Sequence, residues 1–174
     1  MSVQAYRYAP PIPKNLVDTT GRVIFSYMFS PVDTIPAYRK IRHFGEPGYP
    51  AGMLRTSMDD FSKFIITLLN RGEYQNIRLL KPETVEMILD PQNMKNISSR
   101  SYKLIDRGLT WQMVDLNGNK YYEMNGFSGG IYTDALFSPD KNTGIIFYFT
   151  GINMKNMQAI PEIANALETA LEEY

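Results

Sequence analysis

The stretch Tyr121–Gly130, YYEMNGFSGG, decides how this sequence is interpreted, because it combines strand-forming aromatic residues with closely spaced glycines. Gly126, Gly129 and Gly130 leave the backbone uncovered by side chains. Such a strand either makes a tight corner or lets a ligand approach its main-chain N–H groups. The stretch therefore predicts a strand that runs into a turn, with a second strand starting at Gly130.

Further strands are predicted on both sides of this stretch. Asn117, Gly118 and Asn119 are typical of a hairpin turn, and SPDKNTG at Ser138–Gly144 is a second turn. Consecutive antiparallel strands explain this spacing most simply. The predicted strands are Gly108–Leu116, Lys120–Gly126, Gly130–Ser138 and Gly144–Thr150.

Three amphipathic helices are predicted around these strands. The first begins near Ser57 and ends by Gly72, and the second begins at Pro82 and stops before Pro91. The apolar face of the first consists of Phe61, Phe64, Ile65, Leu68 and Leu69. The third runs from about Met157 to Glu172 and should cover one face of the sheet. Its apolar face consists of Ile160, Ile163, Ala164, Leu167 and Leu171.

Residues 1–50 differ from the rest because they are rich in proline and tyrosine. Proline prevents long helices and removes ladder donors, so this region should be extended loop with one short strand at Gly21–Phe29. Residues 51–174 should contain the helices, the antiparallel sheet and the C-terminal helix. We expect one domain overall, of the α+β class, with about four antiparallel strands packed with helices.

Composition excludes several classes of function. Lys plus Arg and Asp plus Glu both total 18, so the formal net charge is zero and nucleic acid is not an expected partner. The 174 residues contain no cysteine and one histidine, so we expect neither a metal site nor a cofactor. No apolar stretch is long enough to cross a bilayer, so a soluble chain without a membrane span is expected.

Three segments carry a resemblance to a known family. The first is PAGMLRTSMDDFSKFI, Pro50–Ile65, and the second is RGEYQNIRLLKPETVEMIL, Arg71–Leu89. The third starts with GLTW, Gly108–Trp111, and continues through MNGFSGG to SPDKNTG. In order and spacing these segments resemble the serine β-lactamase-like family, which includes class C β-lactamases, D-alanyl-D-alanine peptidases and related esterases. The resemblance covers roughly residues 48–172.

The resemblance implies hydrolysis of an amide or ester through an acyl-serine. Family enzymes use a serine nucleophile in an S-x-x-K helix start and a tyrosine in a Y-x-N loop. Both motifs precede the matched segments, so the resemblance implies that this chain corresponds to the second half of the fold, without a catalytic residue of its own. Parents of this family are often exported to the periplasm or cell surface, while the compartment of this chain is left open.

The family's third motif is histidine or lysine, then a small polar residue, then glycine, and Met124, Asn125 and Gly126 occupy its positions. Methionine donates no hydrogen bond, whereas Asn125 can bind a substrate carboxylate or amide, and Phe127 would supply a backbone N–H to an oxyanion hole. The resemblance thus implies a substrate-binding wall. Its residues are Met124, Asn125, Gly126, Phe127, Ser128 and Gly129. The alternative is that Met124 is a core residue and the glycines only shape the hairpin.

Other literal matches to catalytic motifs have structural explanations. Ser138–Lys141 fits S-x-x-K but contains Pro139 and Asp140, so it should form a strand-to-strand turn. Tyr74–Asn76 fits Y-x-N in a segment that predicts a surface turn. Neither segment is predicted to be catalytic.

Two single residues were considered as catalytic groups. Ser128 echoes the G-x-S-x-G elbow, yet that motif requires a strand-to-helix turn and a strand is predicted after Gly130. His43 is the only histidine and lies among the cations Arg39, Lys40 and Arg42, which favours a surface loop position.

Three functional hypotheses remain open from the sequence. In the first, the chain is the C-terminal portion of a hydrolase, inactive alone, whose parent acts on a peptide, β-lactam or ester. In the second, it is a non-catalytic binding module whose exposed sheet edge pairs with a partner or with a second copy. In the third, the missing N-terminal half is a separate chain that restores activity on mixing.

Overall fold

The fold is described from a computed structural model, which describes residues 7–9, 39–41, 52, 54–94, 101–128, 131–150 and 157–172. The chain divides into two compact units. The first consists of Met1–Met53, Gly126–Tyr132 and Tyr148–Gln158, and the second of Leu54–Asn125, Thr133–Phe147 and Ala159–Tyr174. The second unit contains the helices and most of the sheet.

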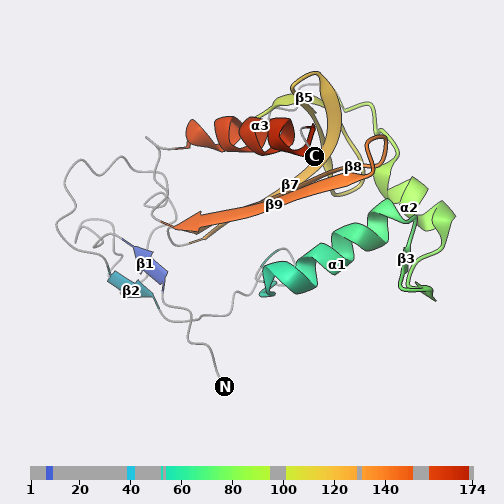
Figure 1. Cartoon of the computed structure of the whole chain (residues 1–174), viewed down its shortest axis with the longest axis horizontal. Coiled ribbons are helices and arrows are strands. Elements are labelled where there is room, and N and C mark those ends of the chain that lie inside the picture. Colours follow the sequence, from blue (N-terminus) through green and yellow to red (C-terminus); the bar gives the residue numbers. More distant parts are fainter. Residues whose placement is uncertain are drawn as a thin grey trace. The chain divides into compact units, whose positions relative to one another are not determined.

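The central element is a five-stranded antiparallel sheet in which neighbouring strands follow one another along the chain (Figure 1). Its strands, in order, are β5 (Lys103–Arg107), β6 (Gln112–Leu116), β7 (Asn119–Ser128), β8 (Ile131–Ser138) and β9 (Thr143–Thr150). The predicted α+β class and the consecutive strand order are confirmed. The strand that carries the YYEMNGFSGG stretch lies at the centre of the sheet.

The sequence missed β5 and placed the start of β6 too early. The first predicted strand of the sheet begins at Gly108, and no strand is predicted over Lys103–Arg107. In the structure Gly108–Trp111 is a tight connection in which the Gly108 N–H donates to the Trp111 carbonyl at 2.8 Å. A bulge between Leu104 and Asp106 interrupts the alternation of β5, which explains why its pattern was weak.

The first helix, α1, spans Met58–Leu69 and has the predicted start. The Ser57 side chain accepts a hydrogen bond from the Asp60 N–H at 3.0 Å, which satisfies one free donor at the helix start. The helix ends where Arg71 and Gly72 adopt positive φ. The predicted apolar face is correct for Ile65 and Leu68, which are buried, but Phe64 is 43% exposed.

The second helix, α2, spans Pro82–Leu89 as predicted, with proline in its first turn. A short hairpin, β3 (Glu73–Tyr74) and β4 (Ile77–Arg78), connects it to α1. Close packing requires glycine at position 108, because an added Cβ would lie 2.4 Å from the Ile88 carbonyl oxygen. This glycine brings the sheet strands against α2.

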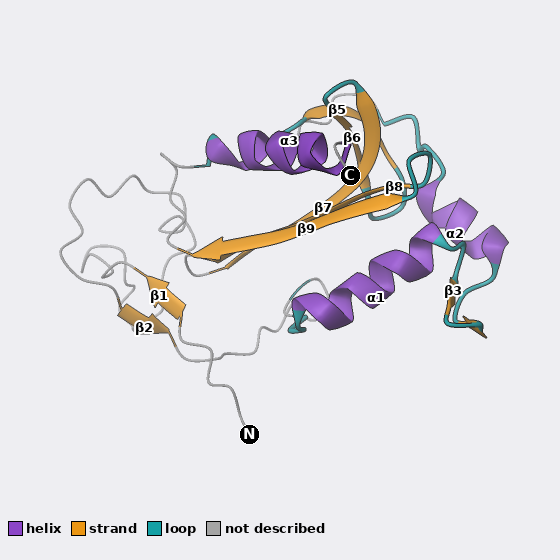
Figure 2. Ribbon diagram, viewed as in Figure 1, coloured by secondary structure: helices purple, strands orange, loops and turns teal. Residues whose placement is uncertain are grey.

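Helices α1 and α2 cover one face of the sheet, and α3 (Ala159–Glu172) covers the other (Figure 2). The core on the α1 and α2 face contains aromatic side chains from β7, from β8 and from the connection before β6, and Trp111 of this connection meets Phe137 edge-on with ring centroids 4.8 Å apart. Its buried members are Ile65, Leu68, Val85, Leu89, Trp111, Met113, Tyr122, Ala135 and Phe137.

The buried face of α3 differs from the predicted one. Ile160 and Ala164 are fully buried, but Ile163, Leu167 and Leu171 are between 36% and 45% exposed. The third buried residue of the helix is Glu168, which is 1% exposed.

Glu168 joins α3 to two turns of the sheet. Its Oε1 accepts hydrogen bonds from Lys141 Nζ at 2.7 Å and Asn119 Nδ2 at 3.0 Å, and its Oε2 accepts one from Asn117 Nδ2 at 2.9 Å. The Tyr121 hydroxyl lies 3.4 Å from Oε1. A buried charge is tolerated only with such partners. These donors therefore allow Glu168, which is not part of the predicted apolar face, to be buried on the side of α3 that faces the sheet.

In the first unit, β1 (Arg7–Ala9) pairs antiparallel with β2 (Arg39–Ile41). The prediction that Gly21–Phe29 is the one strand of residues 1–50 is therefore wrong, since two other segments form strands. Three-residue strands are too short to show an alternating pattern. The segment Gly21–Phe29 itself lies outside the described residues.

Candidate functional site

The residues of the predicted substrate-binding wall follow one another along the second half of β7. Met124 is 38% exposed and Asn125 is also exposed, whereas Gly126 and Phe127 are half-buried. The exposure of Met124 contradicts the alternative that it is a core residue. Ser128 ends the strand, but its side chain and the whole of Gly129 lie outside the described part of the chain.

Successive side chains of β7 point to opposite faces of the sheet. Tyr122 faces α2, because its hydroxyl donates to the Leu89 carbonyl at 3.2 Å, and Met124 shares that face. Tyr121 faces α3, because its hydroxyl contacts Glu168, and alternation therefore puts Glu123 and Asn125 on the α3 side.

Glu123 belongs to a row of polar side chains that crosses the sheet, called here the polar row. Glu123 and Asp134 are its buried members, and Gln112 and Arg107 are half-buried. The partner of Glu123 on β6 is Gln112, and the partner of Gln112 on β5 is Arg107. The positive charge of Arg107 acts on Glu123, and Arg107 Nε is buried without a hydrogen-bond partner among the described residues. On the other side of β7, the Asp134 carboxyl of β8 is close enough to affect the pKa of Glu123.

Each carboxyl of this row has a different set of contacts. Asn125 Nδ2 donates to Glu123 Oε1 at 2.5 Å, and the Tyr102 hydroxyl donates to Asp134 Oδ2 at 2.6 Å. Glu123 is 0% exposed and Asp134 is 1% exposed. No N–H or hydroxyl group of the described residues donates to Glu123 Oε2. Two carboxyl groups can hydrogen-bond to each other only when one of them carries a proton.

Burial raises the pKa of Glu123 above its ordinary value. Three weaker effects act in the opposite direction: the hydrogen bond from Asn125, the hydrogen bond with Asp134 and the charge of Arg107. The net effect is a raised pKa, as expected for a carboxyl group that is buried beside a second one.

Two accidental motifs are excluded as catalytic groups. Ser138 ends β8 and is followed by a turn instead of a helix, and its buried Oγ has no hydrogen-bond partner among the described residues. Lys141, the other end of this S-x-x-K match, binds Glu168 instead. Tyr74–Asn76 lies at the tip of the β3–β4 hairpin, where Gln75 and Asn76 have positive φ.

A strand follows Ser128, as predicted. Strand β8 begins at Ile131, so no helix follows the serine as a nucleophile elbow requires. His43 lies outside the described residues.

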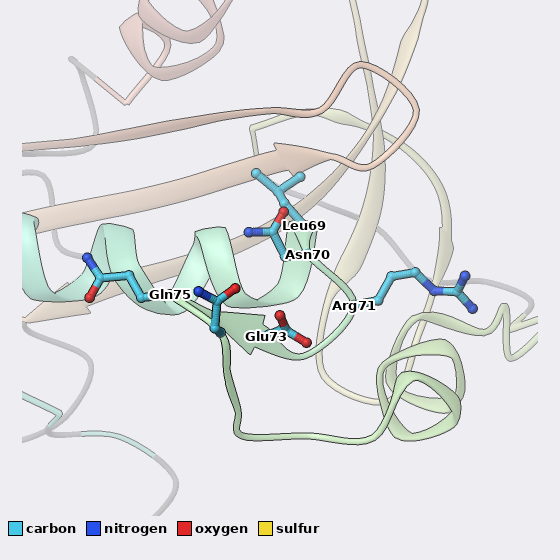
Figure 3. Close-up of a pocket in the computed structure, with 6 residues that line it drawn as sticks. Leu69, Asn70, Arg71, Glu73 and Gln75 are labelled. Atoms are coloured by element: carbon cyan, nitrogen blue, oxygen red, sulfur yellow. The ribbon is translucent and has the colours of Figure 1, made fainter.

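A shallow hollow of about 440 Å³ lies between the end of α1 and the β3–β4 hairpin, and the two elements supply all six lining residues (Figure 3). These are Leu69, Asn70, Arg71, Glu73, Gln75 and Asn76. Arg71 forms an ion pair with Glu86, and Glu73 forms one with Arg78. The hollow contains no residue of β7, and its charged groups already have protein partners.

The described residues contain neither a cluster of metal ligands nor a helix that could cross a membrane. Within the described segments, no three histidine, cysteine or acidic side chains gather as a metal ion would require. No described helix has both the length and the apolar character needed to cross a membrane.

The charged residues of the polar row, and the tyrosine that donates to one of them, were not predicted as site residues from the sequence. They are Arg107, Glu123, Asp134 and Tyr102. Only Glu123 carried a usable signal, because alternation with Tyr121 puts it on an inward face next to the motif positions. The others come from strands whose pairing could not be known from local patterns.

Comparisons with other proteins do not add a relative. No family model matches the chain, and neither a curated protein nor a solved structure matches it.

Proposed function

We propose that this chain is the C-terminal portion of a serine β-lactamase-like hydrolase. In this proposal it contributes one wall of the substrate cleft, and the serine nucleophile comes from a segment outside the 174 residues. The parent hydrolyses an amide or ester through an acyl-serine. The chain alone is inactive.

The observation that carries the proposal is the position of the third-motif residues. Met124 and Asn125 occupy the central strand of an antiparallel sheet and are both exposed, although their neighbours Tyr121, Tyr122 and Glu123 are buried. Because alternate side chains of a strand point to opposite faces, Asn125 and Met124 are exposed on different sides of the sheet. Asn125, next to Gly126 on the α3 side, is the side chain suited to contact a ligand that lies along the strand.

Two experiments test this proposal. The chain alone should not hydrolyse nitrocefin or p-nitrophenyl acetate. Saturable hydrolysis that is lost in Ser128→Ala and retained in Asn125→Ala would contradict the proposal, because it would make Ser128 a nucleophile.

The second experiment is coexpression with a segment that contains S-x-x-K and Y-x-N, followed by labelling with a fluorescent penicillin. Labelling of that segment should require the present chain, and Asn125→Ala should reduce it about tenfold, the equivalent of one lost hydrogen bond. Labelling that is independent of the present chain would count against the proposal.

A second candidate function is supported by the edge strand β9. Among the described strands β9 pairs only with β8, its eight residues TGIIFYFT contain no charge or proline, and Tyr148 is 59% exposed. Such an edge is suited to pair with another strand. As a binding module, the chain would sediment as a dimer or bind an extended peptide, and Tyr148→Lys would weaken that association. A monomer with the same sedimentation in both variants would exclude self-association.

A further inference from the structure

We propose that Glu123 is a positioning residue that fixes the Asn125 amide with its Nδ2 inward, so that Oδ1 faces the ligand and the site selects groups that donate hydrogen bonds. This inference rests on the proposed function, because it assumes that Asn125 contacts the substrate. It decides between the two ligands that an asparagine at this position can bind. The ligand group would be an amide N–H and not a carboxylate.

The contact between the two side chains is direct. Glu123 Oε1 lies 2.5 Å from Asn125 Nδ2, Glu123 is fully buried, and Asn125 is exposed. The Asn125 amide therefore connects a buried acceptor to the surface. An amide held by one of its two polar ends presents the other end outward.

The hydrogen bond itself fixes which end is held, because Glu123 Oε1 accepts from Asn125 Nδ2. A proton on Glu123 would lie on its other oxygen, Oε2, which has no hydrogen-bond partner among the described residues. Oε1 then remains an acceptor whether or not Glu123 carries a proton. An acceptor at Oε1 requires the donor Nδ2 of Asn125 and leaves Oδ1 for the ligand.

The ligand class follows from this orientation. Oδ1 is an acceptor, so it can bind the N–H of a carboxamide but offers nothing to a carboxylate, which also only accepts. Met124 points to the opposite face of the sheet and supplies no donor either. A terminal carboxylate would therefore meet no positive or donating side chain from these two positions.

The test uses the full 174-residue chain, labelled with ¹⁵N, and two matched probes. N-acetylglycine amide and N-acetylglycine differ only in their terminal group, a carboxamide in one and a carboxylate in the other. Each is titrated while the side-chain amide signal of Asn125 is observed. The carboxamide should bind at least about tenfold more tightly, the equivalent of one hydrogen bond.

Variants of Glu123 separate positioning from charge and from structure. Glu123→Gln keeps an acceptor towards Asn125 and can donate to Asp134, so it should retain the selectivity although the titratable group is gone. Glu123→Met removes the acceptor and should bring the ratio of the two affinities close to one. Glu168→Gln alters another buried glutamate on the same face of the sheet and should leave the ratio unchanged.

A measurement on the unaltered chain keeps the inference testable if Glu123→Met does not fold. The Asn125 side-chain amide protons should exchange with solvent more slowly than those of the exposed Asn142. Equal exchange rates, equal or tighter binding of N-acetylglycine, or no saturable binding of either probe would overturn the inference. None of these measurements requires hydrolysis, so a failure of coexpression to restore activity would contradict the proposed function and leave the selectivity result standing.

Discussion

Two buried glutamates on the same face of the sheet have opposite electrostatic surroundings. Glu168 receives hydrogen bonds from Lys141 and two asparagines, whereas Glu123 receives one from Asn125 and lies beside the Asp134 carboxyl. Burial raises the pKa of both groups, but in Glu168 the hydrogen bonds from Lys141 and the asparagines outweigh it and lower the pKa. In Glu123 burial is the larger effect and the pKa is raised.

Hydrogen-bond donors around an interior carboxyl group, and not burial alone, therefore determine the direction of its pKa shift. Glu168 is ionised and connects α3 to the turns at Asn117 and Lys141, which is a structural role. Glu123 has a raised pKa, lies beside a second carboxyl group and contacts an exposed motif residue. Carboxyl groups whose pKa is raised by burial, as that of Glu123 is, are common at functional sites and also occur in structural networks.

The largest expected effect is the loss of stability in Glu168→Ala. The substitution removes a buried carboxylate that accepts three hydrogen bonds, while its partners Lys141 and Asn117 are exposed enough to be hydrated, so the free energy of unfolding should fall by about 3 kcal/mol. Urea denaturation followed by circular dichroism measures this change. A loss below about 1 kcal/mol, the range of exposed ion pairs, would mean that Glu168 is not ionised and buried as described.

Tyr102→Phe should have an intermediate effect on the other cluster. It removes the hydroxyl that donates to Asp134 at 2.6 Å and leaves a buried acceptor without that bond. The free energy of unfolding should fall by about 2 kcal/mol. Tyr148→Phe, at an exposed position on β9, is the matched control and should have no measurable effect. Equal stability of the two variants would contradict the buried hydrogen bond.

The smallest stability change is expected for Glu123→Gln. Glutamine keeps the shape, accepts from Asn125 and donates to Asp134 without a titrating proton, so the free energy of unfolding at neutral pH should stay within about 1 kcal/mol of the original. Glu168→Gln is the matched substitution and should cost more, because the amide is neutral opposite Lys141. An equal or larger loss in Glu123→Gln would indicate that Glu123 is ionised.

The two glutamates should also respond to pH with opposite signs. The raised pKa of Glu123 stabilises the fold fully below about pH 4.3, the ordinary value for glutamate, and this contribution is lost as the pH rises through the folded-state pKa. The lowered pKa of Glu168 stabilises the fold above about pH 4.3, and this contribution is lost as the pH falls through the folded-state pKa.

The groups that face Glu123 are Asn125, Asp134 and Arg107, and the pH response includes them. The stability of Glu123→Gln relative to the original chain should therefore improve as the pH rises above about 4.3, while that of Glu168→Gln should improve as it falls below this value. Denaturation midpoints measured across this range check both signs. The same sign in both variants would remove the distinction between the two sites.

The sequence predicted the parts of the fold that depend on local patterns. The Ser57 cap, Pro82 at the start of α2 and the Asn117–Gly118 turn are local signals, and the structure has each of them. Strand β5 and the burial of Glu168 depend on distant partners, Asp115 for Lys103 and Lys141 for Glu168. An apolar stripe could not identify Glu168, because its position depends on donors from two turns.

The candidate site shows the same division. The motif positions Met124, Asn125 and Gly126 could be proposed from one short stretch. The hydrogen bond from Asn125 to the buried Glu123 could be identified only from the structure. Asp134 is on β8 and Arg107 on β5, so their relation to Glu123 depends on the register of the sheet. Register is a long-range property that local patterns do not determine.

The most direct test of the contrast between these sites is a ¹³C NMR titration of the two side-chain carboxyl carbons, assigned with Glu123→Gln and Glu168→Gln. Glu123 should titrate above the ordinary glutamate pKa and Glu168 below it, in the same sample. A Glu123 signal that titrates at or below the ordinary value would contradict the raised pKa of Glu123, and with it the contrast between the two sites.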